Sequence, residues 1–286
     1  MRAPHSLPGG SPTMPGGSPD AGVSALLELS PGAAPGSWGA AVLPHLCVGS
    51  GARTFLFGGI ALAACIEVME RTSGAPAAYA SGQFLGAARA GDELRFSASG
   101  ESGSLHQCFF EASRGGQALV RGIGGCGRRD DAAVYQGTAE PALPAPADCE
   151  ERSVARLLSS NLQALFEFRL AAGALPDRAG WSAPGGQALA CWVRSRNGAP
   201  LDRRLLAVIA DCAALAVPGA LGRPSSGSSL DNAIRFAASP EGEWALAATR
   251  VDSVRDGLVH TRTRLFSEQG ALLAVASQTM VLRLWE

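Results

Sequence analysis

The order of elements in this chain occurs twice, and this repeat limits the fold more than any other feature. An apolar helical run, FGGIALAACIEVMERTSG in the first half and LDRRLLAVIADCAALAVPG in the second, is followed in each half by several segments with strand character. Three landmarks recur with offsets of 152, 151 and 154 residues: Phe84 with Phe236, Gly91 with Gly242, and Gly116 with Gly270. A near-constant offset with the same order of elements indicates a duplicated domain.

Each half contains one helix that is apolar on nearly all sides, so this helix must be buried. The segments after it alternate in polarity and end at turn signals such as Arg114-Gly115-Gly116, which is typical of antiparallel strands. Alternating strand and helix units are absent, which disfavours a doubly wound parallel sheet. A sheet wrapped around a buried helix satisfies these demands. That is the hotdog arrangement, and two copies predict an α+β double hotdog.

Proline- and glycine-rich segments indicate the domain boundaries. Residues 1–22 include the pentapeptide PGGSP twice and have little to bury, so we expect a disordered tail. A second stretch rich in proline and alanine, residues 137–149, reads as a linker. The predicted hotdog domains are therefore residues 23–136 and residues 150–286.

Composition argues against several partners. The formal net charge is −1, which gives no reason to expect binding to nucleic acid or to an anionic membrane surface. The seven cysteines are scattered without a C-x-x-C pair, so we expect reduced thiols, no metal site and a cytoplasmic protein. We see neither a signal peptide nor an apolar run of the roughly 18 residues that a membrane span needs. No cofactor is expected.

Asp211 stands out because it is the one acidic residue within LLAVIADCAALA, which contains no basic residue. Asp202 is a suitable N-cap for this helix, and Pro218 and Gly219 are expected to end it. An uncompensated carboxylate inside such a helix is costly, so Asp211 either serves chemistry or has a plainer role. The plainer roles are a place on a narrow solvent-facing stripe and an ion pair with arginine.

Gln278 and Ser229 also have both a functional and a purely structural interpretation. Gln278 is the one polar residue on the apolar face of the last strand, where it is either functional or a buried amide bonded to backbone; a β-bulge would change its face. Ser229 opens SSLDNAIRF on the more polar face, so pattern alone favours a turn serine. The nucleophile elbow, the Walker A motif and H-E-x-x-H are absent. The glycine cluster at residues 122–127 precedes no apolar helix, so it is not read as a dinucleotide site.

The chain resembles the acyl-CoA thioesterase II family, the double-hotdog thioesterases, over about residues 24–136 and 150–286. In the first half the resemblance rests on FGG at the helix start, on QFL followed by GD, and on the closing hairpin. In the second half it rests on an acidic residue in the helix, a Ser-x-Asp motif with a following aromatic, a Trp before a strand, a G-x-L-L-A turn and a final Gln. These are Asp211, Ser229-Leu230-Asp231 with Phe236, Trp244, residues 270–274 and Gln278.

This resemblance implies hydrolysis of acyl-CoA by a water molecule that Asp211, Ser229 and Gln278 hold and activate. It also implies further association into a homo-oligomer. Backbone amides at the start of the first helix, around Gly58 and Gly59, are candidates for the oxyanion site, because helix N-termini favour negative charge.

The chain departs from the family pattern at three places. Ser81-Gly82-Gln83-Phe84 lacks the histidine common before the aromatic residue, Asn232 replaces a common histidine, and Gln278-Thr279-Met280 replaces Gln-Glu-Gly. The main alternative is therefore a double hotdog that binds acyl-CoA or another lipid without turnover. A hydratase of the same superfamily is disfavoured, because no histidine follows Asp211 or Asp231 closely.

Overall fold

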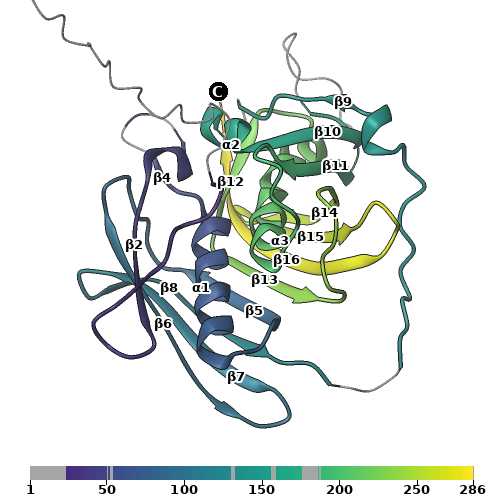
Figure 1. Ribbon diagram of the computed structural model, residues 1–286. Helices are drawn as coiled ribbons and strands as arrows, with labels where there is room; N and C mark the ends of the chain where they lie inside the picture. Colours follow the sequence, from purple (N-terminus) through teal and green to yellow (C-terminus); the bar gives the residue numbers. More distant parts are fainter. Residues whose placement is uncertain are drawn as a thin grey trace, which may run out of the picture.

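Antiparallel strands form one continuous sheet through both halves of the chain (Figure 1). The computed structural model describes residues 24–49, 51, 54–129, 133–155, 159–175, 186 and 188–285. The tail expected at residues 1–22 lies outside the described residues. The strand order β1-β2-β6-β7-β8-β5 continues as β13-β16-β15-β14-β11-β10-β9, and β12 pairs with β16.

In the described part of the first half lie one long helix, two strands paired with each other, and six strands of the large sheet. Its elements are β1 (Ser30–Pro31), β2 (Ser37–Ala41), η1 (Pro44–Leu46), β3 (Cys47–Val48), β4 (Phe55–Leu56), α1 (Gly58–Ser73), β5 (Ala77–Phe84), β6 (Glu93–Ser102), β7 (His106–Arg114) and β8 (Gln117–Cys126). Helix α1 is buried from Gly59 to Met69 and packs against β5 to β8. It ends at Gly74, whose φ of 68° is the left-handed conformation that glycine adopts readily.

The second half repeats this plan with an interrupted helix. Its elements are η3 (Pro146–Asp148), β9 (Glu150–Glu151), α2 (Ser160–Leu165), β10 (Phe166–Ala172), β11 (Ala188–Ser195), α3 (Arg203–Ala210), η4 (Asp211–Leu215), α4 (Ala216–Leu221), β12 (Ser225–Ser229), β13 (Asp231–Phe236), β14 (Ala245–Arg255), β15 (Leu258–Phe266) and β16 (Leu272–Leu284). Each half is a helical segment wrapped by antiparallel strands, so the predicted double hotdog is confirmed (Figure 1). The two sheets join where β5 pairs with β13.

The second helical segment differs from the prediction at its end. Asp202 caps α3 as expected, since its Oδ1 accepts from the amide of Leu205 at 2.8 Å. Pro218 and Gly219, expected to end the helix, lie inside α4, which continues to Leu221 and is capped by Gly222. Pro218 has no amide hydrogen for the carbonyl four residues before it, and the chain just upstream adopts the tighter 3-10 form of η4. Proline therefore changes the form of this helix without ending it.

The helical run from Arg203 to Leu221 also meets the length and composition needed to cross a membrane, with a mean hydropathy of 1.7. The sequence prediction concerned uninterrupted apolar runs, and Asp211 interrupts this one. Within the protein, 72% of that window is buried. Burial against the second sheet accounts for its apolar composition, as expected of a core helix.

The segment expected to be a plain linker packs on the outer face of the second sheet. The indole Nε1 of Trp192 donates to the carbonyl of Pro144 at 2.9 Å, and Arg169 donates to the carbonyl of Pro146 at 2.9 Å. Leu143 and Cys149 belong to the apolar cluster around Trp192, Trp244, Leu246 and Phe266. The connection between the domains thus supplies one side of a second, smaller core.

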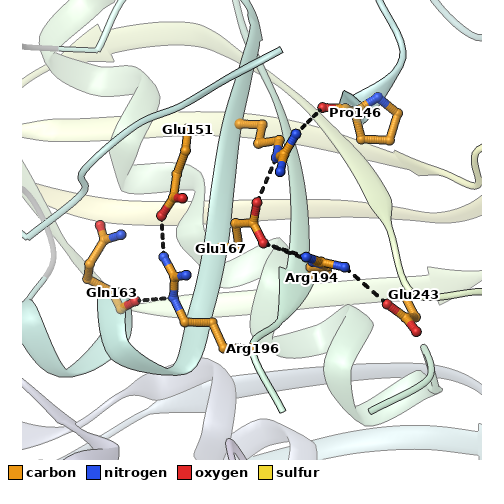
Figure 2. Close-up of polar contacts among 8 residues, drawn as sticks. Pro146, Glu151, Gln163, Glu167, Arg194, Arg196 and Glu243 are labelled. Atoms are coloured by element: carbon orange, nitrogen blue, oxygen red, sulfur yellow. Dashed lines mark hydrogen bonds and ion pairs between the residues drawn. The ribbon is translucent and has the colours of Figure 1, made fainter. Parts of the chain in front are cut away.

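Beside this cluster, charged side chains pair across strands β10 and β11. Figure 2 shows Glu167 bonded to Arg194, which also donates to Glu243. Arg169 donates to the other oxygen of Glu167 at 2.6 Å. Burial raises the pKa of Glu167, but the bonds from Arg169 and Arg194 outweigh it, so the pKa lies below its ordinary value. Glu167 is therefore a buried carboxylate held ionised by its partners.

Candidate active site

Asp211 lies at the junction of α3 and η4, with only 2% of its surface exposed. Its Oδ2 accepts from the backbone amide of Gly59 in α1 at 2.7 Å. Its Oδ1 accepts from Gln278 in β16, from Asn232 Nδ2 in β13 at 3.2 Å and from Ser229 Oγ in β12 at 3.4 Å. Four elements from both halves of the chain therefore converge on one carboxylate.

Each of these donors is electrically neutral, which separates Asp211 from the ion-paired Glu167. Burial raises the pKa of Asp211 from 3.8 to about 7, and the bonds from Gly59, Asn232, Gln278 and Ser229 oppose this rise. The two plainer roles considered for Asp211 do not fit: it faces no solvent, and its described contacts include no arginine. A carboxylate in this state can take up or release a proton near neutral pH.

The approach of the two halves at Asp211 requires glycine in α1. A Cβ at Gly59 would lie 2.7 Å from Asp211 Cβ and 2.9 Å from Val208 Cα, closer than real Cβ contacts. A Cβ at Gly58 would lie 3.0 Å from Asp211 Oδ2 and 3.1 Å from the ring of Phe84. Glycine at both positions lets the start of α1 reach the carboxylate, so the Gly59 amide can donate to it.

Gln278 lies on the inner face of β16, as alternation predicts, and is 4% exposed. Besides Asp211, its Nε2 also donates to Ser229 Oγ at 2.7 Å. This side chain therefore links the carboxylate and the hydroxyl. The plain alternative, an amide whose bonds go to backbone, does not describe these contacts.

Ser229 reaches the site through a β-bulge that the pattern did not reveal. It is the last residue of β12, opposite Met280, whereas Ala233 of β13 is opposite Ser277, so the register shifts by one residue between them. Leu230 donates its amide to the carbonyl of Thr279 at 2.8 Å, and Asp231 Oδ1 accepts the Thr279 amide at 2.6 Å. Two residues thus oppose one, which is the definition of a bulge.

The bulge brings Ser229 and Asn232, three positions apart, to the same side of the sheet, where both bond Asp211. In a regular strand, residues three apart face opposite sides. The sequence pattern predicts one uninterrupted strand with Ser229 on its more polar face, and it distinguishes Asn232 only as a departure from the family pattern. Asn232 is 1% exposed and shares the inner face of β13 with the buried Ile234, so alternation in this strand could have identified it.

The structure thus brings Asp211, Ser229, Gln278 and Gly59 together, with Gly58 beside them. Gly59 was expected to face an oxyanion, but its amide donates to the Asp211 carboxylate. Of the other departures, Ser81 pairs with Ala233 in the sheet, and the hydroxyl of Thr279 lies 3.4 Å from His260 Nδ1. Among the described residues, no group of three or more His, Cys, Asp or Glu could hold a metal ion.

Residues 141–282, which include Asp211, Ser229 and Gln278, match the family model of the acyl-CoA thioesterase C-terminal domain. No curated protein matches the sequence. A solved structure from Novosphingobium aromaticivorans, assigned as a thioesterase, is 26% identical over 86% of this chain and 95% of its own, with a TM-score of 0.77.

Two more distant structures share the fold. A hot dog fold protein of unknown function from Alicyclobacillus acidocaldarius is 18% identical, over 91% of this chain and 97% of its own, with a TM-score of 0.78. An acyl-CoA thioesterase II from Mycobacterium marinum is 20% identical, over 92% of this chain and 98% of its own, with a TM-score of 0.69. These likenesses extend over both halves.

Proposed function

The chain belongs to the acyl-CoA thioesterase II-like family of double-hotdog thioester hydrolases, and we propose that it cleaves acyl-CoA with a water molecule that Asp211 activates. The observation that carries this proposal is a buried carboxylate held by neutral donors, with a pKa of about 7. A general base is most effective when its pKa lies near the working pH. An ordinary aspartate would be ionised at neutral pH but a far weaker base.

In the proposed reaction, Asp211 takes a proton from water as the water oxygen bonds to the thioester carbonyl carbon. Ser229 and Gln278, which contact each other and Asp211, hold the water in line for this attack. Holding reactants in a fixed geometry removes much of the entropic barrier. The tetrahedral intermediate then breaks its carbon–sulfur bond, the thiolate accepts a proton from Asp211, and a free acid and CoA leave. No covalent intermediate with the enzyme is needed.

The oxyanion of the intermediate needs a separate donor, because the Gly59 amide is bonded to Asp211 in the resting structure. The first amides of a helix have no acceptor within that helix. Gly58, the first residue of α1, therefore supplies the remaining candidate at this end. One such donor typically lowers the barrier by about 3 kcal/mol.

A panel of acyl-CoA thioesters, assayed by release of free thiol, tests this function. We expect turnover of at least one acyl-CoA, with free CoA and free acid formed in equal amounts. The control is the same panel with heat-denatured protein. Saturable binding of acyl-CoA without thiol release across the panel would contradict the proposal and would favour a binding protein.

A further inference from the structure

Asn232 contacts Asp211 but has no role in the hydrolysis proposed above. It lies opposite Gln278 across the bulge, is 1% exposed, and donates through Nδ2 to Asp211 Oδ1 at 3.2 Å. Oδ1 also accepts hydrogen bonds from Gln278 and from the more distant Ser229 hydroxyl. Among the described contacts, Oδ2 accepts a hydrogen bond only from the Gly59 amide. A carboxylate offers about four lone-pair sites, two on each oxygen. The crowded oxygen is Oδ1, and Oδ2 retains room for a further hydrogen.

The carbonyl ends of the two amides support this reading. Asn232 Oδ1 and Gln278 Oε1 are both buried and have no hydrogen-bond partner among the described residues. A buried amide kept for structure alone normally satisfies both its donor and its acceptor. Here both amides turn their donor ends toward Asp211 and leave the acceptor ends unmatched, so the carboxylate determines their orientation.

The first half shows that the fold does not need an amide at this position. Its own bulge lies in β5, where the register shifts between Ala77 and Tyr79, and Ala80 occupies the place that corresponds to Asn232 at an offset of 152 residues. Ala80 is 1% exposed, so the same bulge packs well around a methyl group. The amide at Asn232 is therefore explained by Asp211 and not by the strand.

We propose that Asn232 is a positioning residue for the hydrolysis: with Gln278 it occupies Oδ1 of Asp211 and leaves Oδ2 as the atom that takes the proton from water. This inference rests on the proposed function, because it assigns a role within the same site. The proton would then be taken up next to the Gly59 amide, at the N-terminus of α1.

The groups that contact Asp211 are neutral, which makes the expected pH effect simple. The elements packed against it present neutral donors: Gly59 from α1, Ser229 from β12, Asn232 from β13 and Gln278 from β16. Cys212, its neighbour, is titratable; burial and the charge of Asp211 raise the pKa of its thiol well above its ordinary value, so it stays neutral. Removing the Asn232 donor destabilises the ionised carboxylate and must raise the pKa of Asp211.

The kinetic test compares Asn232→Ala and the isosteric Asn232→Asp with a matched control, Asn161→Ala. Asn161 donates to the carbonyls of Pro44 and Cys47 and makes no hydrogen bond to Asp211 among the described contacts. In Asn232→Ala we expect the acidic limb of the kcat/KM profile to move upward by about one pH unit, the size usual for one bond to a charged group. Asn232→Asp should move it further, since two carboxylates would face each other. The control should keep the wild-type limb.

Infrared difference titration of the Asp211 carboxyl in ligand-free protein separates this inference from the proposed function. The band is assigned by its loss in Asp211→Asn. We expect the same upward shift of the titration in Asn232→Ala, with or without turnover. An unchanged titration in folded Asn232→Ala and Asn232→Asp would overturn the positioning role even if the enzyme is active. If the Asp211 titration shifts but the acidic limb of the kcat/KM profile does not, Asn232 contacts Asp211 as described, but Asp211 is not the general base.

Discussion

The two halves of this chain have the same fold but place different side chains at corresponding positions of the inner face. The second half carries three polar residues where the first half carries small ones: Asp211 corresponds to Gly59, Asn232 to Ala80, and Gln278 to Gly124, with offsets of 152, 152 and 154 residues. Even the bulge is duplicated, since Ala78 and Tyr79 oppose Gly125 as Leu230 and Asp231 oppose Thr279. The scaffold is therefore common, and the polar cluster around Asp211 belongs to a few side chains of one half.

The small residues of the first half have their own physical role. A Cβ at Gly124 would lie 2.8 Å from the carbonyl oxygen of Tyr79 and closer still to Met69, and a Cβ at Gly59 would collide with α3 and Asp211. The first half thus makes room for helix contacts and gives one backbone amide to the carboxylate of the second. This division predicts one site per chain, although the fold offers two equivalent places.

The outer faces differ as well. In the second half, Trp192, Trp244 and Phe266 are covered by the segment before β9 and are at most 9% exposed. In the first half, Phe109 and Ile123, which are register partners, are 68% and 52% exposed. The second domain therefore depends on the interdomain segment for part of its core, and the first does not.

The largest stability difference is expected between Trp192→Ala and Phe109→Ala. Truncating the buried indole removes its packing and its hydrogen bond to the carbonyl of Pro144, which keeps only the weak donor Cys149 Sγ, at a cost of about 3–5 kcal/mol. The exposed phenyl ring should cost about 0.5 kcal/mol or less. Chemical denaturation of both variants measures the two values. Equal losses would mean that the covered face is not a core.

A smaller effect is expected at the contact between the halves, in Gly59→Ala. The added methyl group meets Asp211 and the backbone of α3, so we expect a loss of about 1–3 kcal/mol and a clear drop in kcat. Gly39→Ala in β2 is the control, because its Cβ would lie at an ordinary 3.8 Å from Leu94 O. Thermal melting and thiol release compare the variants. Wild-type activity in Gly59→Ala would show that the close approach of α1 is unimportant.

Periodicity and the repeat predicted the double hotdog, the start of α1 and the cap at Asp202, because these depend on local pattern. Asp211 and Gln278 could be found for the same reason: each is a lone polar group on an apolar face. Ser229 needed the family resemblance, because a bulge at Leu230 and Asp231 changes which side chains face inward. Asn232 was missed although it alternates with the buried Ile234 and is therefore also a lone polar group on an apolar face. The Gly59 contact joins residues 152 positions apart, and pattern within one helix carries no sign of it. The prediction that the helix ends at Pro218 was wrong, because Pro218 lies in the first turn of a second helix, α4, where proline is tolerated.

The most direct test of the account is Asp211→Asn, measured as kcat/KM on acyl-CoA across pH. The wild-type rate should rise with pH through the Asp211 pKa of about 7 and level off above it, because the ionised carboxylate is the active form. The Asn variant should stay folded by melting temperature, lose about 10²-fold or more of the rate and lose that limb. Ser229→Ala and Gln278→Ala should each lose less, since they position the water. A folded Asp211→Asn variant with wild-type turnover would show that Asp211 is a packing residue and would contradict the mechanism.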